Sequence, residues 1–283
     1  MSQHKEQQGF VTFAQNTDTV DYLELAYLQA LNVKATQKNN QYAVIVDTAT
    51  EEKINDSHRR VFDYIIRVPY DNNNASSNWK LGNEYQVFNL TPFKETIKLE
   101  SDLLFTRSID HWWTAFRLKD LCLSTHARNY RDLISGVRKY RRVFDDNELP
   151  DVYNGLMYFR YSRDGANFFK VAEVLHRNWH HIKNEILVNC REDNPSTDVL
   201  YALAAMIVGV ETCTMPGMDF INFVHMKSEF NGWLDARSWV DTVLYEQEGD
   251  VIRINNLNQL SPVHYYDKNF ATKELIEYYE SRI

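Results

Sequence analysis

Three short apolar runs in the first quarter of the chain alternate with polar or helix-like stretches. They cover residues 9–16, 42–47 and 63–69, and each has the length of a strand and ends at polar or turn-forming residues. Apolar residues recur at helical spacing over 20–33, between the first two runs. Strands separated by helical segments favour a parallel α/β sheet, whose ligand site lies at the carboxyl ends of the strands. We therefore expect the chemistry in the loops that follow these strands.

The same pattern extends downstream. The predicted elements are a short helix at 91–96, a strand over 97–105, a strand at 154–160, a long amphipathic helix at 167–188 and a buried helix at 199–210. The last of these contains the longest apolar run, which is well short of the ~20 residues that span a bilayer, so no membrane segment is predicted. The chain shows no internal repeat.

Composition and charge narrow the class of protein. The 283 residues are 44% hydrophobic and 25% charged, which predicts a sizeable core and excludes disorder. A formal net charge of −8 excludes a global attraction to nucleic acid or anionic lipid, so any such binding needs a local patch. Cys122, Cys190 and Cys213 are widely spaced, and the N-terminus is polar. Both observations favour a reducing, cytoplasmic compartment.

The sharpest chemical feature is Glu100-Ser101-Asp102, set between apolar residues. An acid-x-acid tripeptide alone is most often a solvated turn. Here it interrupts an apolar strand, where unpaired charge is costly, and a turn or bulge at the strand end would let both carboxylates reach one cation. Hard oxygen ligands suit Mg²⁺ or Mn²⁺, which take one or two carboxylates together with substrate phosphates.

The run from Thr91 to Asp102 resembles the short helix and "leucine-acid-x-Asp" strand of the GT-A glycosyltransferases. In that fold, the acid-x-acid motif holds the metal that bridges the diphosphate of a nucleotide sugar. Glu100 stands where Asp is commoner, which makes Asp102 the firmer ligand. The resemblance implies an α/β protein with a GT-A-like, Rossmann-type mixed sheet flanked by helices, in one compact domain of two abutting halves.

Those two halves divide the chain, 1–283, near residue 110. Residues 9–110 would bind the nucleotide sugar, and residues 111–283 would bind the acceptor and supply a C-terminal metal and phosphate segment. In that segment the resemblance makes His264 the third metal ligand and Lys268 a diphosphate contact. His225, with Lys227 two residues later, is a rival ligand, and the histidine that does not bind metal would contact acceptor or sugar. A lone histidine is as often an ordinary packed or surface residue.

The resemblance also places the donor's base and ribose at the end of the first strand. The residues implied there are Phe13, Ala14, Gln15, Asn16 and Thr17. Asp47 ends the second strand nearby, Lys80 precedes the metal strand next to Trp79, and Ser101 lies within the motif itself. Taken singly, Trp79 and Lys80 are more often structural.

Asn154 and Gly155 are similar to the Asn-Gly strand that lies near acceptor and sugar in GT-A enzymes. A glycine there lets backbone approach a ligand closely. Asp198 is either the N-cap of the buried helix or the catalytic or sugar-binding acid that the resemblance places at this point. We therefore expect Asp102 and Asp198 to be the catalytic residues.

Residues 128–142 hold six basic residues and one acid. On a helix, Arg131, Arg138 and Arg142 would share one face. The acceptor candidates in this stretch are Arg131, Arg138, Lys139, Arg141 and Arg142. Arginine with interleaved tyrosine suits a phosphate backbone or an unstacked base, although a solvated face that balances nearby acids is equally consistent. We expect a polyanionic acceptor here.

The segment from Thr91 through Asp198 resembles glycosyltransferases of tailed phages related to the T-even type, some of which glycosylate hydroxymethylated pyrimidines in DNA. The resulting hypothesis is a metal-dependent transferase that moves a sugar from a nucleoside-diphosphate sugar to a hydroxyl on a hydroxymethylated pyrimidine of phage DNA. We expect a UDP-sugar as the donor and the host cytoplasm as the location. One alternative is the same chemistry on surface polysaccharide or protein. The other is a non-catalytic sugar-nucleotide-binding or virion-associated protein.

Overall fold

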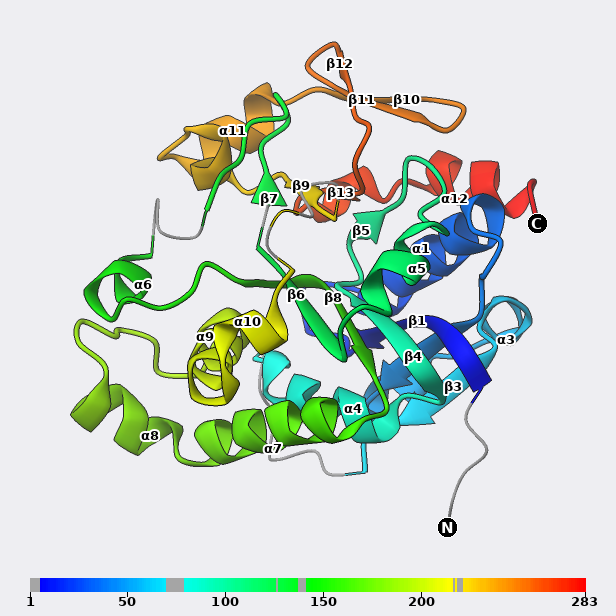
Figure 1. Ribbon diagram of the computed structural model, residues 1–283. Helices are drawn as coiled ribbons and strands as arrows, with labels where there is room; N and C mark the ends of the chain where they lie inside the picture. The colour runs from blue at the N-terminus through cyan, green and yellow to red at the C-terminus, as the bar shows by residue number, and fades with distance from the viewer. Residues whose placement is uncertain (1–5, 70–78, 126, 137–140, 216, 218–220) are drawn as a thin grey trace.

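The largest sheet has six strands in the order β3-β2-β1-β4-β8-β6 (Figure 1). The structure is a computed structural model that describes residues 6–69, 79–125, 127–136, 141–215, 217 and 221–283. The strands of this sheet are β1 (Glu6–Ala14), β2 (Tyr42–Val46), β3 (Tyr64–Arg67), β4 (Phe93–Leu99), β6 (Leu121–Ser124) and β8 (Tyr153–Arg160). The first four in sheet order run parallel, and β8 pairs antiparallel with β4 and β6. The predicted mixed α/β sheet is confirmed.

Helices cover both faces of this sheet (Figure 1). On one side α1 (Tyr22–Thr36) packs with α12 (Lys273–Glu280), and on the other α7 (Arg163–Arg177) packs with α9 (Thr197–Val208). The shorter helices are α2 (Thr48–Glu51), α3 (Asp56–Val61), α4 (Val87–Leu90), α5 (Trp112–Phe116), α6 (Arg142–Asp146), α8 (Trp179–His181), α10 (Val210–Cys213) and α11 (Ala236–Thr242). Within the described ranges, no helix combines the length and apolarity needed to cross a bilayer.

The predicted helix at 91–96 is wrong, because these residues end one element and begin β4. Thr91 is the C-cap of the short helix α4, with ψ near 135°. A residue before proline disfavours the helical region, so Thr91-Pro92 stops a helix here rather than starting one. The predicted strand over 97–105 is divided, since β4 ends at Leu99 and β5 (Leu103–Leu104) follows a turn.

Two further helix predictions need correction. The long helix expected at 167–188 ends at Arg177, where Asn178 leaves the helical region and short turns follow. The described part of the basic stretch, residues 128–136 and 141–142, does not form the expected helix: its start belongs to β7 (Ala127–Arg128), Asp132 has a positive φ of 63°, and α6 begins only at Arg142. Arg131 and Arg142 therefore share no helical face, and Arg138 and Lys139 lie outside the described residues. The helix expected at 199–210 is present as α9, but it ends at Val208 before Gly209, whose φ is 102°, and it exposes Met206 and Ile207 in its last turn.

A small sheet brings the C-terminal segment to the acid-x-acid turn. Its order is β5-β13-β9-β7, with β13 (Val263–His264) between β5 and β9 (Phe223–His225). His264 pairs with Leu103 on one side and with His225 on the other. A separate meander is formed by β10 (Tyr245–Glu248), β11 (Val251–Ile254) and β12 (Leu257–Asn258). One core of buried side chains runs through both predicted halves, whose boundary near residue 110 stays a prediction.

A glycine in β1 tests the packing of the main sheet. A Cβ added at Gly9 would lie 2.4 Å from Cζ of Phe93, whose ring is fully buried and has little room to move. We expect Gly9→Ala to lower the free energy of unfolding by about 1–3 kcal/mol in urea denaturation, because overpacking forces neighbours to shift. In a Phe93→Leu background the same change should cost clearly less. Equal costs in the two backgrounds would contradict this contact.

Candidate functional site

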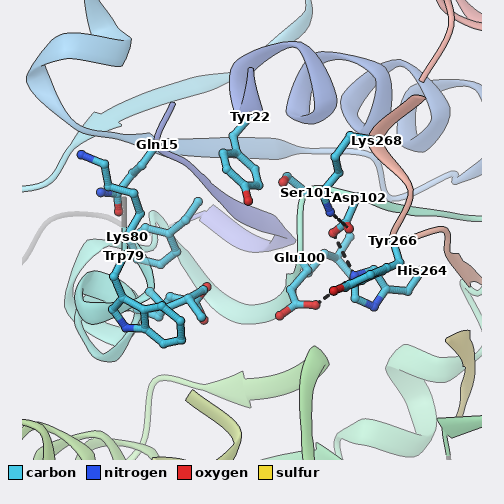
Figure 2. Close-up of a pocket in the computed structure, with 14 residues that line it drawn as sticks. Gln15, Tyr22, Trp79, Lys80, Glu100, Ser101, Asp102, His264, Tyr266 and Lys268 are labelled. Atoms are coloured by element: carbon cyan, nitrogen blue, oxygen red, sulfur yellow. Dashed lines mark hydrogen bonds and ion pairs between the residues drawn. The ribbon is translucent and has the colours of Figure 1, made fainter. Parts of the chain in front are cut away.

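Glu100, Asp102 and His264 converge at the carboxyl end of β4 (Figure 2). The Nε2 atom of His264 lies 3.1 Å from Oε2 of Glu100 and 2.9 Å from Oδ1 of Asp102. Two backbone hydrogen bonds fix this arrangement, from the Leu103 N–H to the Glu100 carbonyl at 3.2 Å and from the Tyr265 N–H to the Asp102 carbonyl at 3.1 Å. The turn after β4 thus lets both carboxylates face one imidazole.

The surrounding charges and burial shift the pKa of each residue in this triad. Burial raises the pKa of Glu100 above its usual value. Burial alone would also raise the pKa of Asp102, but His264 and Lys268 lower it well below the usual range. Burial would lower the pKa of His264, and the two facing carboxylates raise it instead. Asp102 therefore stays ionised and holds two cationic partners, because Lys268 also donates a hydrogen bond to it.

The triad fits a divalent cation. One ligand atom from each residue lies within 4.8 Å of the others, and no second group of three histidine, cysteine or acidic residues does so in the described parts of the chain. Two carboxylates and one imidazole form a ligand set that suits Mn²⁺. Mg²⁺ is the second candidate, because it also binds carboxylate oxygens. Because a metal binds neutral imidazole, cation binding would release the proton that the carboxylates favour on His264.

His225, the rival ligand, lies beside the triad and outside it. Its ring stacks on that of His264, with centroids 4.4 Å apart and planes at 22°. Burial and the neighbouring His264 lower the pKa of His225 well below its usual value. A neutral, buried His225 supports His264 by packing and contributes to the wall of a neighbouring cavity.

A cavity of about 350 Å³ opens beside the triad (Figure 2). Five of the predicted donor residues line it: Phe13, Gln15, Lys80, Ser101 and Lys268. Trp79, named above beside Lys80, lines it as well. Tyr22 and Tyr266 also line it, and the sequence analysis identified neither of these two tyrosines. Isolated tyrosines carry no motif, and only the fold brings these two rings to the same cavity.

Four other predicted donor residues do not line this cavity. Ala14 is fully buried. Asn16 accepts a hydrogen bond from the Leu23 N–H at 2.9 Å. Thr17 accepts one from the Val20 N–H at 3.1 Å, so both side chains stabilise the loop that leads into α1. Asp47 caps α2 and pairs with Lys80 Nζ at 3.2 Å. These side chains shape the loops behind the cavity wall.

A second cavity, of about 530 Å³, adjoins the first. Glu100, His264, Tyr266 and Trp79 line both cavities, so two of the three triad residues stand at their junction, and Asp102 lines the first cavity alone. Gly155 lines the second cavity and packs closely against the ring of Phe223, because a Cβ added at this glycine would lie 2.9 Å from Cζ of Phe223.

Asp198 and Arg141 face each other in the second cavity. The N-cap of α9 is Ser196, whose hydroxyl accepts from the Val199 N–H, so Asp198 is not the cap. Its Oδ1 accepts from the Asn154 N–H at 2.8 Å, and its Oδ2 lies 3.2 Å from Arg141 Nη1. Arg141 also pairs with Glu192. The predicted basic residue in this cavity is thus already engaged by two acids.

The other described basic candidates lie on the surface. Arg131 is exposed, with its guanidinium 5.1 Å from the ring centroid of Tyr130. The Arg142 side chain is 84% exposed and lies 4.0 Å from Asp146. Neither lines the second cavity.

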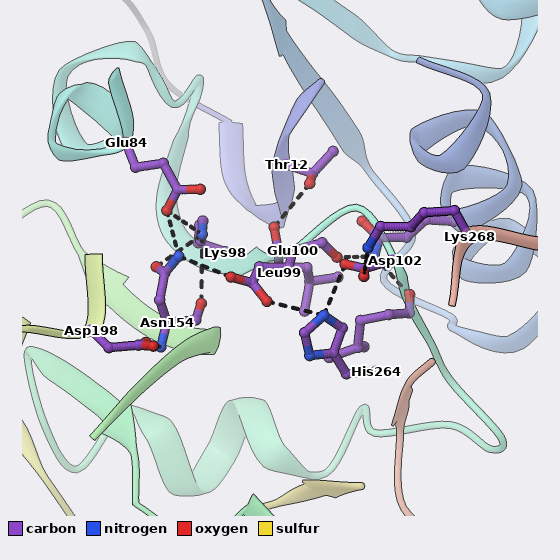
Figure 3. Close-up of polar contacts among 12 residues, drawn as sticks. Thr12, Glu84, Lys98, Leu99, Glu100, Asp102, Asn154, Asp198, His264 and Lys268 are labelled. Atoms are coloured by element: carbon purple, nitrogen blue, oxygen red, sulfur yellow. Dashed lines mark hydrogen bonds and ion pairs between the residues drawn. The ribbon is translucent and has the colours of Figure 1, made fainter. Parts of the chain in front are cut away.

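Behind the triad lies a buried polar cluster that sequence reasoning missed (Figure 3). Lys98 is fully buried, and its Nζ donates to Glu84 Oε2 at 2.7 Å and to Asn154 Oδ1 at 2.9 Å. Nδ2 of Asn154 donates to Glu84 Oε2 at 2.5 Å and to Glu100 Oε1 at 3.3 Å. A lysine within an apolar strand is the signal in the sequence that indicates such a cluster, because a buried ammonium requires a partner.

The sequence matches no protein-family model and no curated protein at a significant level. Among solved structures, the glycosyltransferase GlyE of Streptococcus pneumoniae TIGR4 aligns with 98% of this chain at a TM-score of 0.52 and 12% identity. The chain has a glycosyltransferase fold of the GT-A type. It spans 60% of the length of the pneumococcal protein. The fold expected from the resemblance is confirmed.

Two further solved structures align with this chain at lower TM-scores. The apo form of GlyE aligns with 98% of this chain and 60% of its own, at a TM-score of 0.49 and 11% identity. Apo mouse xyloside xylosyltransferase 1 aligns with 74% of this chain and 84% of its own, at a TM-score of 0.44 and 10% identity. The narrower resemblance to phage glycosyltransferases stays a prediction.

Proposed function

We propose that this protein is a metal-dependent glycosyltransferase, which moves a sugar from a nucleoside-diphosphate sugar to an acceptor hydroxyl. A UDP-sugar is the preferred donor within this proposal. The observation that carries the proposal is the group of Glu100, Asp102 and His264 in a GT-A-type fold, with Glu100 and His264 in the wall of both adjoining cavities. A donor in the first cavity and an acceptor in the second would present their reacting atoms to each other beside the triad.

In the donor cavity, this chain's own residues would hold the diphosphate and the base. Lys268 is a compact positive charge kept in place by Asp102, and it would neutralise part of the diphosphate. Phe13, Tyr22 and Trp79 supply aromatic wall for the base and ribose. Glu100, Asp102 and His264 would bind Mn²⁺ or Mg²⁺, which supplies charge stabilisation for the departing diphosphate.

Asp198 is the candidate acid of the acceptor cavity. Its carboxylate is held by the Asn154 N–H and by Arg141, so its orientation is fixed before any acceptor arrives. It would hydrogen-bond an acceptor or sugar hydroxyl, and it could take the hydroxyl proton as transfer proceeds. Both oxygens of the Asp198 carboxylate are thus already engaged by protein groups, which favours the hydrogen-bonding part of this assignment.

A hydroxymethylated pyrimidine in phage DNA remains the preferred acceptor class within the proposal. Its support is the pair of exposed arginines, Arg131 and Arg142, the second of which directly follows the cavity-lining Arg141 in the sequence. The internal ion pairs of Arg141 with Asp198 and Glu192 instead favour an acceptor that brings no strong negative charge into the cavity. A surface polysaccharide or protein hydroxyl is therefore retained as the second acceptor class.

The cytoplasmic location belongs to the same proposal. Cys122, Cys190 and Cys213 form no disulfide, as expected in a reducing compartment. Burial raises the pKa of Cys122 and of Cys213 to about 12, so neither is a reactive thiol near neutral pH.

A donor screen by thermal shift tests the proposal. With Mn²⁺ present, one nucleotide sugar at a hundredfold excess over its Kd is expected to raise the Tm by roughly 5 °C, since ligand binding stabilises the folded state by about 2.7 kcal/mol under those conditions. EDTA should remove most of this shift. If UDP-, GDP-, CDP- and dTDP-sugars all leave the Tm unchanged with Mn²⁺, the proposed donor site is wrong.

Release of the nucleotide then distinguishes the acceptors. Duplex DNA with hydroxymethylcytosine should accelerate release above the rate with unmodified duplex if DNA is the acceptor. Acceleration by saccharides and none by modified DNA would remove DNA from the proposal and leave glycosyl transfer intact. A protein that binds donor but never releases nucleotide would support the non-catalytic alternative.

A further inference from the structure

Asn154 is buried and lines neither of the two cavities. The residue is 1% exposed, and each of its polar groups has a protein partner. It is therefore not placed to contact an acceptor directly, although its neighbour Gly155 is. Its hydrogen bonds instead run to residues on both sides of the proposed reaction centre (Figure 3).

On the donor side, the Asn154 amide donates to Oε1 of Glu100 at 3.3 Å, while Oε2 of Glu100 faces His264. On the acceptor side, the Asn154 backbone N–H donates to Asp198 at 2.8 Å. One residue of β8 thus holds a carboxylate of the triad through its side chain and the acceptor-side carboxylate through its backbone.

Two buried charges fix which way round the amide lies. Lys98 can only donate, so the atom of Asn154 that it meets at 2.9 Å must be the oxygen. The Glu84 carboxylate accepts from the other end at 2.5 Å, so that atom must be the nitrogen. A flipped amide would set its N–H groups against the ammonium and its oxygen against two carboxylates. The ion pair of Lys98 with Glu84 therefore keeps an N–H aimed at Glu100.

We propose that Asn154 is a positioning residue, which orients Glu100 for metal binding and ties that orientation to Asp198. This inference rests on the proposed function, because it assigns Glu100 to the metal. Groups that hydrogen-bond a metal ligand set its orientation, and their loss typically lowers metal affinity 10–100-fold. Unlike Asp102, which two cationic partners hold, Glu100 faces His264 with one oxygen and Asn154 with the other.

Asn154→Asp tests this role, because aspartate has the same shape and cannot donate when ionised. Mn²⁺ binding to the full chain, measured by isothermal titration calorimetry without donor, is expected to weaken at least tenfold. Transfer activity should show a larger rise in the Mn²⁺ concentration for half-maximal rate than in the donor KM. The backbone bond to Asp198 is retained in this variant.

Thr96→Val is the matched control, because it removes a buried hydroxyl of the neighbouring strand that pairs with Thr91 at 2.9 Å, away from the triad. Its Mn²⁺ affinity should stay within twofold of the parent chain. If circular dichroism shows that Asn154→Asp is unfolded, Asn154→Ser removes the amide without adding charge and is expected to show the same tenfold weakening.

The outcomes separate this inference from the proposed function. A parent chain that binds no Mn²⁺ overturns the proposed metal site and this role with it. A parent that binds Mn²⁺, with a folded Asn154 variant that binds it equally or more tightly, overturns the positioning role and leaves the proposed function standing. A folded variant with tenfold weaker binding and an unaffected control supports the role.

Discussion

Asp102→Asn is expected to lower sugar transfer by on the order of 10³-fold or more while the protein stays folded. Removal of a single preorganised electrostatic contact commonly costs 10²–10³-fold in kcat, and this carboxylate contacts two cationic partners at once. Its Oδ1 lies 2.9 Å from His264 Nε2, and its other oxygen accepts from Lys268. Asparagine is nearly isosteric but neutral, so it would lose the metal ligand and release Lys268 from its fixed position.

The measurement is nucleotide release from the donor that the thermal-shift screen selects, with and without Mn²⁺. Asp241→Asn is a matched control, because it removes one negative charge from an exposed position on α11. The control should keep the parent's rate and its response to Mn²⁺. Parent-like turnover by a folded Asp102→Asn chain would exclude this residue from the reaction and the metal site.

Lys98→Met is expected to lower the free energy of unfolding by about 3–5 kcal/mol, because it leaves the buried Glu84 carboxylate without its ammonium partner. Lys98 is fully buried and Glu84 is 5% exposed, so water cannot replace the lost charge. Their charged atoms lie 2.7 Å apart. Breaking such a pair costs far more than breaking one on the surface.

Urea denaturation of three variants separates the charge from the packing. Lys98→Met together with Glu84→Gln removes both charges and should recover much of the loss. Lys170→Met is the surface control, since that side chain is 69% exposed in its pair with Glu173, and it should cost less than about 0.5 kcal/mol. If Lys98→Met costs no more than Lys170→Met, the buried pair does not hold this part of the core.

Local patterns were sufficient for the N-terminal half-sheet and for the convergence of the acidic pair with His264. β1, β2 and β3 follow from apolar runs of strand length, and β4 follows them into the same sheet. A turn or bulge was expected at the end of the strand because two acids interrupt an apolar stretch, but the turn at Glu100 and Asp102 instead divides the predicted strand into β4 and β5. The Thr91-Pro92 pair was misinterpreted, since a proline near a capping residue fits a helix start as well as a helix end, and only the paired strands settle which.

Long-range pairing explains the remaining misses. Arg141 was counted as part of a basic face, but its partners Glu192 and Asp198 lie 51 and 57 residues further along the chain. Glu84 precedes Lys98 by 14 residues and is joined to it across the buried cluster, not along a helix. A count of local charges contains no information about such partners, so it overstates how much positive charge a surface offers.

The register of the two-residue strand β13 has a consequence for the order of folding. His264 reaches the acid-x-acid turn only when β13 is seated between β5 and β9, and Lys268 bonds to a carboxylate 166 residues earlier in the chain. Contacts of such high sequence separation carry a large loop-closure cost and form late. A folding intermediate that contains only the parallel strands offers a cation two carboxylates that repel each other. Tight metal binding would therefore report the completion of folding, and a pulse of Mn²⁺ during refolding would time the docking of the last segment.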